Sequence, residues 1–217
     1  MTQRIIIADD HPLFRTALSH AVGKVWPDAT VIEASSAAAA RTEVEMGAEA
    51  LLLDLHMDDS QGLSALMDFR QDFPALPVVI VSASEEQRIY TAAQQLGAAA
   101  FIPKSASLDA MRDALAAVRA GDSWFPEPLA EVDDDLARIA SLTPAQRRIL
   151  GQLQSGLLNK QIAYELDISE ATVKAHITAI FRKLGVVSRT QAVLLATKLD
   201  ADQPAADAGA SGSPAPA

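Results

Sequence analysis

Residues 1–120 alternate between short apolar runs and longer segments of helical character, and this alternation limits what the 217-residue chain can fold into. In several runs the apolar side chains occupy successive positions, which is typical of strands buried on both faces. We expect strands over 4–10, 30–35, 50–56, 77–84 and 98–105. We expect helices over 12–24, 36–46, 62–72, 85–95 and 107–119. Five strand–helix units predict an α/β fold with a doubly wound, five-stranded parallel sheet.

The pattern changes after residue 121. The segments "PEP" and "DDD" that follow are typical of a linker, although a short helix over 129–140 would also fit. From "LTPAQ" onward the pattern is wholly helical, with Thr143 as the expected N-cap. The end of the chain is rich in Ala, Pro, Gly and Ser, which predicts disorder. The expected division is an α/β domain over 1–121, a linker over 122–140, a small all-α domain over 141–199 and a disordered tail over 200–217.

Charge divides the chain in the same way. The net charge is −10, but residues 1–130 carry 9 Lys and Arg against 18 Asp and Glu, whereas residues 141–199 carry 8 against 3. A compact basic module joined to an acidic body is consistent with nucleic-acid binding by the second part alone, or with ordinary solvated charge. Cysteine is absent, which excludes disulfides. No apolar run approaches the ~20 residues of a membrane span and no signal peptide is evident, so we expect a cytoplasmic protein without a membrane partner.

Polar residues end four of the expected strands. Because ligands of doubly wound sheets bind beyond the carboxyl ends of the strands, we expect these residues to share one shallow pocket: Asp9, Asp10, Asp54, Ser82 and Lys104. Three neighbouring carboxylates repel one another, and Mg²⁺ is a natural neutraliser that pairs readily with phosphate. Such a pocket suits phosphoryl transfer to a carboxylate, with the metal and the lysine stabilising the phosphoryl oxygens. Each residue alone has an ordinary interpretation as a helix cap, a turn or a solvated charge.

Taken together, "IIIADDHPLFR", "LLLDLHM", "VVIVSAS" and "AAFIPKSA" resemble the receiver domain of two-component response regulators over about residues 3–121. The resemblance implies a flavodoxin-like fold that a sensor histidine kinase phosphorylates on Asp54. It implies that Asp10, Asp54 and the main-chain carbonyl of His56 bind Mg²⁺, with Asp9 acting through the waters of the ion. Ser82 and Lys104 would contact the phosphoryl group, and Phe101 matches the aromatic switch position coupled to Ser82.

Two positions depart from the receiver pattern. Asp58 and Asp59 occupy the loop after the phosphoacceptor, where many receivers have proline, and this added negative charge is expected to alter Mg²⁺ affinity. Ser105 follows the lysine, where many receivers have proline, as it does in many members of this subfamily. Neither departure removes a group that the chemistry needs.

The basic module contains two short helical segments, 159–167 and 170–185, joined by a tight turn. Apolar residues of the first are spaced to face apolar residues of the second, which predicts a helix-turn-helix whose second helix enters a major groove of double-stranded DNA. Asn159 and Ser169 are the expected N-caps of the two helices. A small helical bundle with solvated charges is the alternative.

Several polar or small residues of this module are candidate DNA contacts. Lys174 is the candidate for a contact to a base edge, which we expect to be that of guanine, and the exposed Ala175 and Thr178 are candidate contacts beside it. Thr172 and the helix N-terminus are expected to bind phosphate. Further phosphate contacts, which would make binding salt-dependent, are expected from Lys160, Arg182, Lys183 and Arg189.

The stretch "LTPAQRRIL" with "NKQIAYELDISEATVKAHITAIFRKLGV" and "SRTQAV" resembles the LuxR-type output domain of the NarL/FixJ group of response regulators. That resemblance implies that the helix with Lys174 is the recognition helix. It also implies that the last helix pairs two copies on DNA, with Val193 and Leu194 as candidates for the interface.

The chain is therefore expected to be a transcriptional regulator rather than an enzyme. We expect phosphorylation to control it, either by promoting a homodimer or by releasing the basic module from the acidic receiver. One alternative is a receiver-containing adaptor that acts by protein–protein contact without DNA binding. Another is a stand-alone phosphatase or hydrolase that uses the Mg²⁺ pocket, although no further base or substrate pocket is evident in the sequence.

Overall fold

A computed structural model describes the chain except for residues 1–2, 58, 128–132 and 198–217. The expected disordered tail and Asp58 thus lie outside the described residues. The first part of the chain forms a five-stranded sheet with the order β2-β1-β3-β6-β7. Every neighbouring pair in it is parallel. Its strands are β1 (Arg4–Ala8), β2 (Thr30–Ala34), β3 (Ala50–Asp54), β6 (Val78–Ser82) and β7 (Ala100–Pro103).

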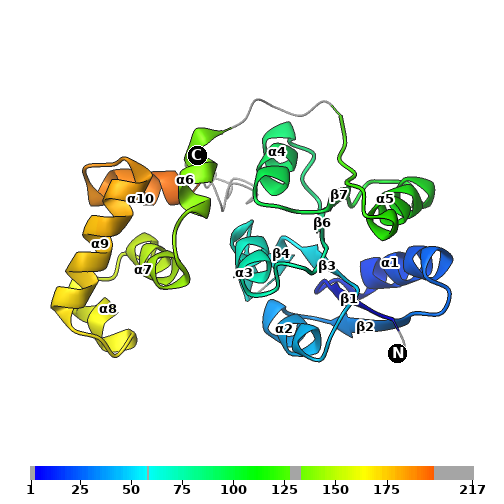
Figure 1. Cartoon of the computed structure of the whole chain (residues 1–217), viewed down its shortest axis with the longest axis horizontal. Coiled ribbons are helices and arrows are strands. Elements are labelled where there is room, and N and C mark those ends of the chain that lie inside the picture. The colour runs from blue at the N-terminus through cyan, green and yellow to red at the C-terminus, as the bar shows by residue number, and fades with distance from the viewer. Residues whose placement is uncertain (1–2, 58, 128–132, 198–217) are drawn as a thin grey trace, which may run out of the picture.

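Helices cover both faces of this sheet, as Figure 1 shows. Two of them lie on one face, α1 (Pro12–Val25) and α5 (Leu108–Ala120). Three lie on the other, α2 (Ala37–Glu45), α3 (Ser64–Asp72) and α4 (Gln87–Gln95). The expected doubly wound α/β fold is confirmed.

The continuous apolar runs are explained by burial on both faces. Ile5 and Ile7 pack with the residues of α1 and α5, whereas Ile6 packs into the cluster on the opposite face. Leu52 and Leu53 divide in the same way between the two clusters. Successive side chains of a strand point to opposite faces, so a strand covered by helices on both sides needs an apolar residue at every position.

The chain after β3 forms a feature that periodicity did not predict. Two short antiparallel strands, β4 (His56–Met57) and β5 (Ser60–Gln61), make a hairpin between the main sheet and α3. Two-residue strands are too short to produce an alternating pattern of their own.

Between residues 133 and 197, every helix or strand that the structure describes is a helix. These helices are α6 (Asp134–Ala140), α7 (Pro144–Gln154), α8 (Asn159–Glu165), α9 (Glu170–Leu184) and α10 (Arg189–Ala196). Thr143 and Gln146 form the expected capping box at the start of α7, and the Ser169 side chain caps α9 by accepting a hydrogen bond from the N–H of Thr172. The expected small all-α helix-turn-helix domain is confirmed.

The expected N-cap of α8 is wrong. Asn159 is the first residue of that helix, and Leu158 holds the cap position without a side-chain cap. The Gln161 side chain accepts a hydrogen bond from the Leu158 N–H at 2.7 Å instead. Gln161, in the first turn, therefore stabilises the start of α8 with its side chain, whereas Asn159 does not cap the helix.

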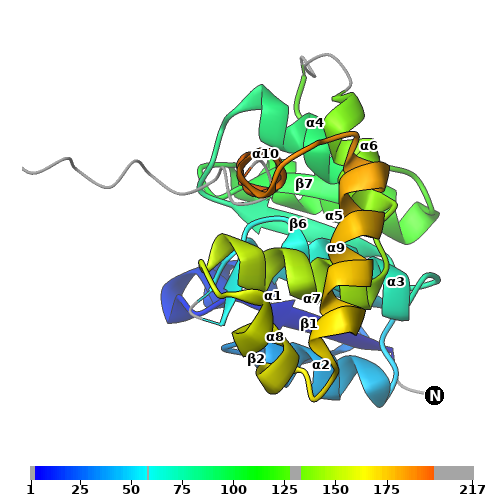
Figure 2. The ribbon, with the colours of Figure 1, turned by 90° about the vertical axis from the view of Figure 1, so that its left-hand side faces the viewer.

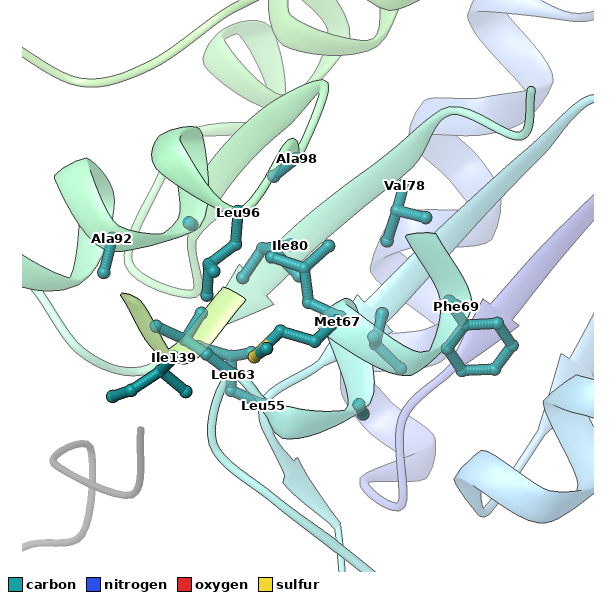
Figure 3. Close-up of a cluster of buried hydrophobic side chains, with 14 of the residues drawn as sticks. Leu55, Leu63, Met67, Phe69, Val78, Ile80, Ala92, Leu96, Ala98 and Ile139 are labelled. Atoms are coloured by element: carbon teal, nitrogen blue, oxygen red, sulfur yellow. The ribbon is translucent and has the colours of Figure 1, made fainter. Parts of the chain in front are cut away.

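Helix α6 joins the two parts of the chain and lies within the segment expected to be a linker. Its Ile139 is fully buried. In Figure 3 this side chain lies beside Leu63 of the segment before α3 and Leu96 at the end of α4. The end of the expected linker is therefore a docked helix, because Leu136 and Ile139 are buried in an apolar cluster that contains residues of α4 and of the helical domain.

An ion pair adds to this contact between the two parts. Arg147 of α7 donates hydrogen bonds to the carboxylate of Asp68 on α3, at 2.9 and 3.2 Å. The pair borders a cleft of about 600 Å³ between α3 and α7, which is also lined by Arg41, Asp72 and Arg148. Asp9, Asp54 and Lys104 do not line this cleft.

The chain also returns to the sheet after α5. The N–H of Trp124 donates to the carbonyl of Ala99 at 3.2 Å, and the Trp124 carbonyl accepts from the N–H of Phe101 at 3.0 Å. Strand β7 is an edge strand, so these bonds satisfy backbone groups that the sheet itself leaves unpaired. None of the helices in the described ranges is long and apolar enough to span a membrane.

Candidate functional site

Parallel strand pairing gathers the expected carboxylates at one edge of the sheet. Asp9 directly follows β1, and Asp54 is the last residue of the neighbouring β3. Both side chains are fully buried. Ser82 ends β6 and is also buried, while Lys104 directly follows β7. Four strands thus deliver the groups that the sequence placed together.

Lys104 connects the two buried carboxylates. Its Nζ lies 2.7 Å from Asp54 Oδ2 and 2.9 Å from Asp9 Oδ2. The ammonium group also lies 5.0 Å from the centre of the Phe14 ring. Buried carboxylates that face each other need a nearby positive charge, and Lys104 supplies one in this arrangement.

Burial and pairing shift the pKa values of this group in a consistent direction. Burial raises the pKa of Asp54, and the hydrogen bond from Lys104 offsets this increase only in part. Burial alone would lower the pKa of Lys104, but its hydrogen bonds to Asp54 and Asp9 outweigh that effect and raise it. Lys104 therefore remains a cation at neutral pH, next to a carboxylate that binds a proton more readily than an exposed aspartate does.

The remaining donors of the cluster fit a divalent cation. Carboxylate oxygens of Asp9, Asp10 and Asp54 and a nitrogen of His11 all lie within 4.8 Å of one another. Asp9 Oδ2 and Asp10 Oδ1 are buried, and they face two cationic or titratable groups, Lys104 Nζ at 2.9 Å and His11 Nδ1 at 2.5 Å. Oxygen donors at a strand edge are what Mg²⁺ prefers, so these residues are suited to hold it.

His11 is a member of this cluster that sequence reasoning did not include. Its Nδ1 lies 2.5 Å from Asp10 Oδ1 and 3.4 Å from Asp9 Oδ1, and its side chain is two-thirds exposed. The signal in the sequence was its position directly after the two acids. A histidine between a strand and a helix can also be an ordinary loop residue, so its place in the site is evident only from the structure.

The expected switch residues lie on adjacent strands. Ser82 Oγ accepts a hydrogen bond from the N–H of Ser84 at 3.1 Å, and the Ser82 carbonyl accepts from the N–H of Lys104 at 2.7 Å. Phe101 is fully buried, with its ring centre 4.5 Å from that of Tyr90 on α4. Phe101 therefore contacts α4 through its ring and Trp124 through its backbone.

The helical module contains a second candidate site. Ile162 and Ala163 of α8 and Val173 and Ile180 of α9 are buried together, which confirms the facing predicted from their spacing. Gly185 ends α9 with a φ of 69°, a conformation that favours glycine. Figure 2 looks onto the side of the molecule opposite the sheet and shows α9 at the front. The outer face of α9 therefore points away from the α/β domain.

Most of the candidate DNA contacts are exposed on or near this face: Lys160, Thr172, Lys174, Ala175, Thr178 and Arg182. Lys174 is paired with Glu170 one turn earlier, at 3.0 Å. Exposed pairs of this kind contribute little to stability, so a DNA base or phosphate can displace the glutamate at small cost.

Two other expected phosphate contacts have partners within the domain. Lys183 Nζ donates to the carbonyl of Ser141 at 2.7 Å. Arg189 donates to the carbonyls of Leu153 and Leu157, at 3.1 and 2.7 Å, and so caps the end of α7. Both side chains have a structural role in this arrangement, and phosphate contact by either stays a prediction.

The last helix has an exposed apolar residue. Leu194 of α10 is 64% exposed, whereas Val193 is partly buried against the core of the domain. Of the two candidates for pairing of copies, Leu194 is thus the one that presents its side chain to solvent.

Comparison with known proteins gives two family matches and full-length relatives. The family "Response regulator receiver domain" matches residues 5–116, and "Bacterial regulatory proteins, luxR family" matches residues 140–196. A glycerol metabolism activator from Pseudomonas putida is 37% identical over 91% of this chain and 96% of its own. The nitrate/nitrite response regulator protein NarL from Escherichia coli is 30% identical over 88% of this chain and 93% of its own.

Solved structures support the fold. The response regulator RcsB from Salmonella enterica serovar Typhimurium, in a structure bound to promoter DNA, matches 91% of this chain and 99% of its own with a TM-score of 0.55 and 22% identity. This likeness concerns the architecture alone. Together with the two family matches and the full-length relatives, the geometry of the strand edge and of α8 and α9 leads to one conclusion: this chain belongs to the NarL/FixJ-type response regulators, which join a receiver domain to a LuxR-type DNA-binding domain and regulate transcription.

Proposed function

We propose that Asp54 accepts a phosphoryl group from a sensor histidine kinase and that this modification controls DNA binding by α9. One observation carries the proposal: Lys104 contacts both Asp54 and Asp9 at the strand edge, where carboxylate oxygens of Asp9, Asp10 and Asp54 lie close enough together to hold a cation. The cluster has a nucleophile, a fixed cation and donors for a second cation, which are the parts that phosphoryl transfer requires.

In this proposal Asp10, Asp54 and the main-chain carbonyl of His56 would hold Mg²⁺, with Asp9 acting through the waters of the ion. The bound ion would neutralise charge on the transferred group. Asp54 is the nucleophile: its carboxylate oxygen attacks the phosphorus of a phosphohistidine on the kinase, the P–N bond breaks, and the imidazole leaves without the phosphoryl group. Lys104 pairs with the phosphoryl oxygens on Asp54, and the Ser82 hydroxyl donates a hydrogen bond to them. The side chain of Phe101 changes its rotamer when Ser82 moves, because the two residues lie on the adjacent strands β7 and β6.

The DNA-binding half of the proposal rests on the exposed face of α9. Lys174 contacts a base edge, and Thr172 together with the N-terminus of α9 contacts a phosphate. Lys160 and Arg182 are the exposed cations placed for further phosphate contacts. Phosphorylation favours a homodimer that reads a site of roughly two-fold symmetry. The same proposal places the chain in the cytoplasm, where a bacterial kinase and the chromosome are accessible to it.

Phosphoryl acceptance is tested with acetyl phosphate or phosphoramidate in the presence of Mg²⁺. The intact mass of the chain should increase by one phosphoryl group. Asp54→Asn should abolish this increase, because the amide is not a nucleophile of that kind. Asp109→Asn is the matched control, since Asp109 is an exposed aspartate of the same domain that pairs with Arg112. Labelling that persists in Asp54→Asn would overturn the assignment.

DNA control is tested by comparing the phosphorylated and unphosphorylated chain in footprinting on genomic DNA fragments. We expect phosphorylation to strengthen protection of specific sites. If Asp54 is phosphorylated but neither form protects DNA, the chain acts as a protein-binding adaptor and the DNA-binding half of the proposal is wrong.

A further inference from the structure

The loop after the phosphoacceptor is anchored to a helix that the proposed chemistry does not use. Asp59 lies between the strands of the β4–β5 hairpin. Its Oδ1 accepts a hydrogen bond from the N–H of Ala37 at 2.9 Å, and its Oδ2 accepts one from the N–H of Ala38 at 3.0 Å. Ala37 and Ala38 are the first two residues of α2. A carboxylate more than twenty residues away thus binds the start of this helix with both oxygens.

The start of α2 is a favourable place for that carboxylate. The first N–H groups of a helix have no partner within the helix, and the N-terminus carries a partial positive charge. Ser36 satisfies one of these groups, because its Oγ accepts from the N–H of Ala39 at 3.1 Å. Asp59 satisfies the two before it, and the first turn of α2 contains no acidic residue of its own. The two caps are complementary, but only Asp59 belongs to the phosphorylation loop.

The other end of the same loop is fixed at the phosphoacceptor. The N–H of His56 donates to Asp54 Oδ1 at 3.1 Å. The N–H of Gly62 donates to the Leu55 carbonyl at 2.9 Å and closes the base of the hairpin. His56 therefore lies between a contact to Asp54 and a hairpin whose far end is attached to α2. The direction of its carbonyl depends on both attachments.

We propose that Asp59 is a positioning residue for Mg²⁺ binding: by attaching the hairpin to the N-terminus of α2, it holds the His56 carbonyl in the direction that the ion requires. The inference rests on the proposed function, because it takes the His56 carbonyl as a Mg²⁺ ligand. Mg²⁺ demands nearly ideal octahedral geometry, so its affinity is sensitive to a carbonyl that is free to rotate. It follows that Mg²⁺ binding and the Asp59–α2 contact stabilise each other.

The chain offers a matched control. Asp59→Ala and Ser36→Ala each remove a side chain that caps α2, but only the first releases the hairpin. In calorimetric titrations of the full-length protein with MgCl₂, we expect Asp59→Ala to weaken Mg²⁺ binding about tenfold, as is usual when a partner that orients a ligand is lost. Ser36→Ala should change the affinity less than about twofold, since its loss leaves the loop attached.

Asp59→Ala also removes a negative charge near the site, and this loss is a separate reason for a lower Mg²⁺ affinity. Repeating the titrations at 1 M NaCl distinguishes the two, because the screening length falls to about 3 Å there. A positioning effect persists at high salt. A difference between Asp59→Ala and the unmodified protein that disappears at 1 M NaCl would show that only charge is involved, and the inference would be wrong.

Hydrogen exchange supplies a readout that does not depend on phosphorylation. Mg²⁺ should slow exchange of the Ala37 and Ala38 amides in the unmodified protein, and Asp59→Ala should abolish this Mg²⁺-dependent protection. Equal Mg²⁺ affinity and equal protection in both proteins would overturn the positioning role while leaving the proposed function intact. If the unmodified protein itself binds no Mg²⁺, the metal site of the proposed function fails, and the inference fails with it.

Discussion

The pocket around Asp54 and the exposed face of α9 differ in how their charges are held. In the pocket, Asp9 and Asp54 are fully buried and Lys104 contacts both within 2.9 Å. On α9, Lys174 is 64% exposed and its partner Glu170 lies on the same helix. The first site is arranged before any ligand arrives, whereas the second consists of long side chains that adopt a geometry only against a partner.

This difference determines how strongly each site affects the stability of the protein in the absence of ligands. Buried charges must be paired with one another, so every residue of the pocket constrains its neighbours. Exposed charges are screened by water and salt and constrain little. Changes in the pocket should therefore affect stability, metal binding and signalling together, whereas changes at the exposed side chains of α9 should affect DNA binding alone.

Removal of Lys104 is expected to have the largest effect. Lys104→Ala should abolish the increase in DNA binding that follows phosphorylation, because the modified Asp54 loses its fixed cation. The same change should strengthen Mg²⁺ binding by about tenfold, since Lys104 no longer competes with the ion for Asp9 and Asp54. Gel shifts before and after acetyl phosphate treatment, with calorimetric Mg²⁺ titrations, measure both effects.

Lys24 provides a control for that change, as it is an exposed lysine of α1. Lys24→Ala should leave the phosphorylation response and the Mg²⁺ affinity as they are. If Mg²⁺ binds Lys104→Ala and the unmodified protein equally, the lysine and the ion do not share ligands, and the pocket is less tightly coupled than its geometry indicates.

Lys174→Ala is expected to have the next largest effect, confined to DNA. The loss of a base contact should cost about 1–3 kcal/mol of discrimination between the specific site and random DNA. Competition gel shifts with both DNAs measure it, and thermal unfolding should be unchanged. Lys183→Ala is the comparison: its ammonium group binds the Ser141 carbonyl, so its loss should lower the melting temperature. A uniform loss of affinity for both DNAs in Lys174→Ala would mean that Lys174 contacts phosphate instead.

The contrast between buried, paired charges and exposed charges also explains how much of each region could be predicted from the sequence. The pocket could be predicted because the fold itself brings strand ends together, so residue type and strand order were sufficient for Asp9, Asp54, Ser82 and Lys104. What escaped prediction was local: His11 in the cluster and the attachment of Asp59 to α2. Neither belongs to a periodic pattern, and the second depends on two segments that are more than twenty residues apart.

For the DNA-binding module, the sequence predicted the helices and the facing of α8 and α9 because apolar spacing determines both. It did not distinguish cations that are exposed from those that bind carbonyls. Arg182 and Arg189 look alike in a charge count, yet only Arg189 caps the end of α7. The docking of α6 was also missed: a short helix in this segment was one of the expectations, but a seven-residue helix that begins with two acids shows no sign of docking until Ile139 is seen among its partners.

A smaller effect, on stability, is expected from Asp54→Asn in the absence of Mg²⁺. Burial raises the pKa of Asp54 above that of the unfolded chain, so the folded protein binds this proton more tightly. The contribution of Asp54 to stability is therefore most favourable at acidic pH and falls as the pH rises from the unfolded value of 3.8 through the folded one. Asp54→Asn, which is always neutral, should raise the melting temperature at pH 7.

That stabilisation should shrink on acidification, as Asp54 of the unmodified protein takes up its proton. Asp109→Asn at an exposed position should show no comparable gain. Melting curves of the three proteins in EDTA between acidic and neutral pH make the comparison. A lower melting temperature of Asp54→Asn at pH 7 would mean that its pairing with Lys104 outweighs the cost of burying the carboxylate.

The smallest effect is expected from Arg182→Ala, and salt is needed to detect it. Arg182 is exposed near the end of α9. From there we expect its guanidinium group to reach a phosphate but no base edge. Its loss should weaken binding to specific and random DNA alike and reduce the slope of log affinity against log salt by about one. Arg189→Ala should instead destabilise the domain at all salt concentrations, because its side chain binds backbone carbonyls. If Arg182→Ala and Arg189→Ala both keep the salt slope of the unmodified protein, exposure alone does not identify the cations that contact DNA. Exposed and internally bonded cations of the module would then not differ in their role.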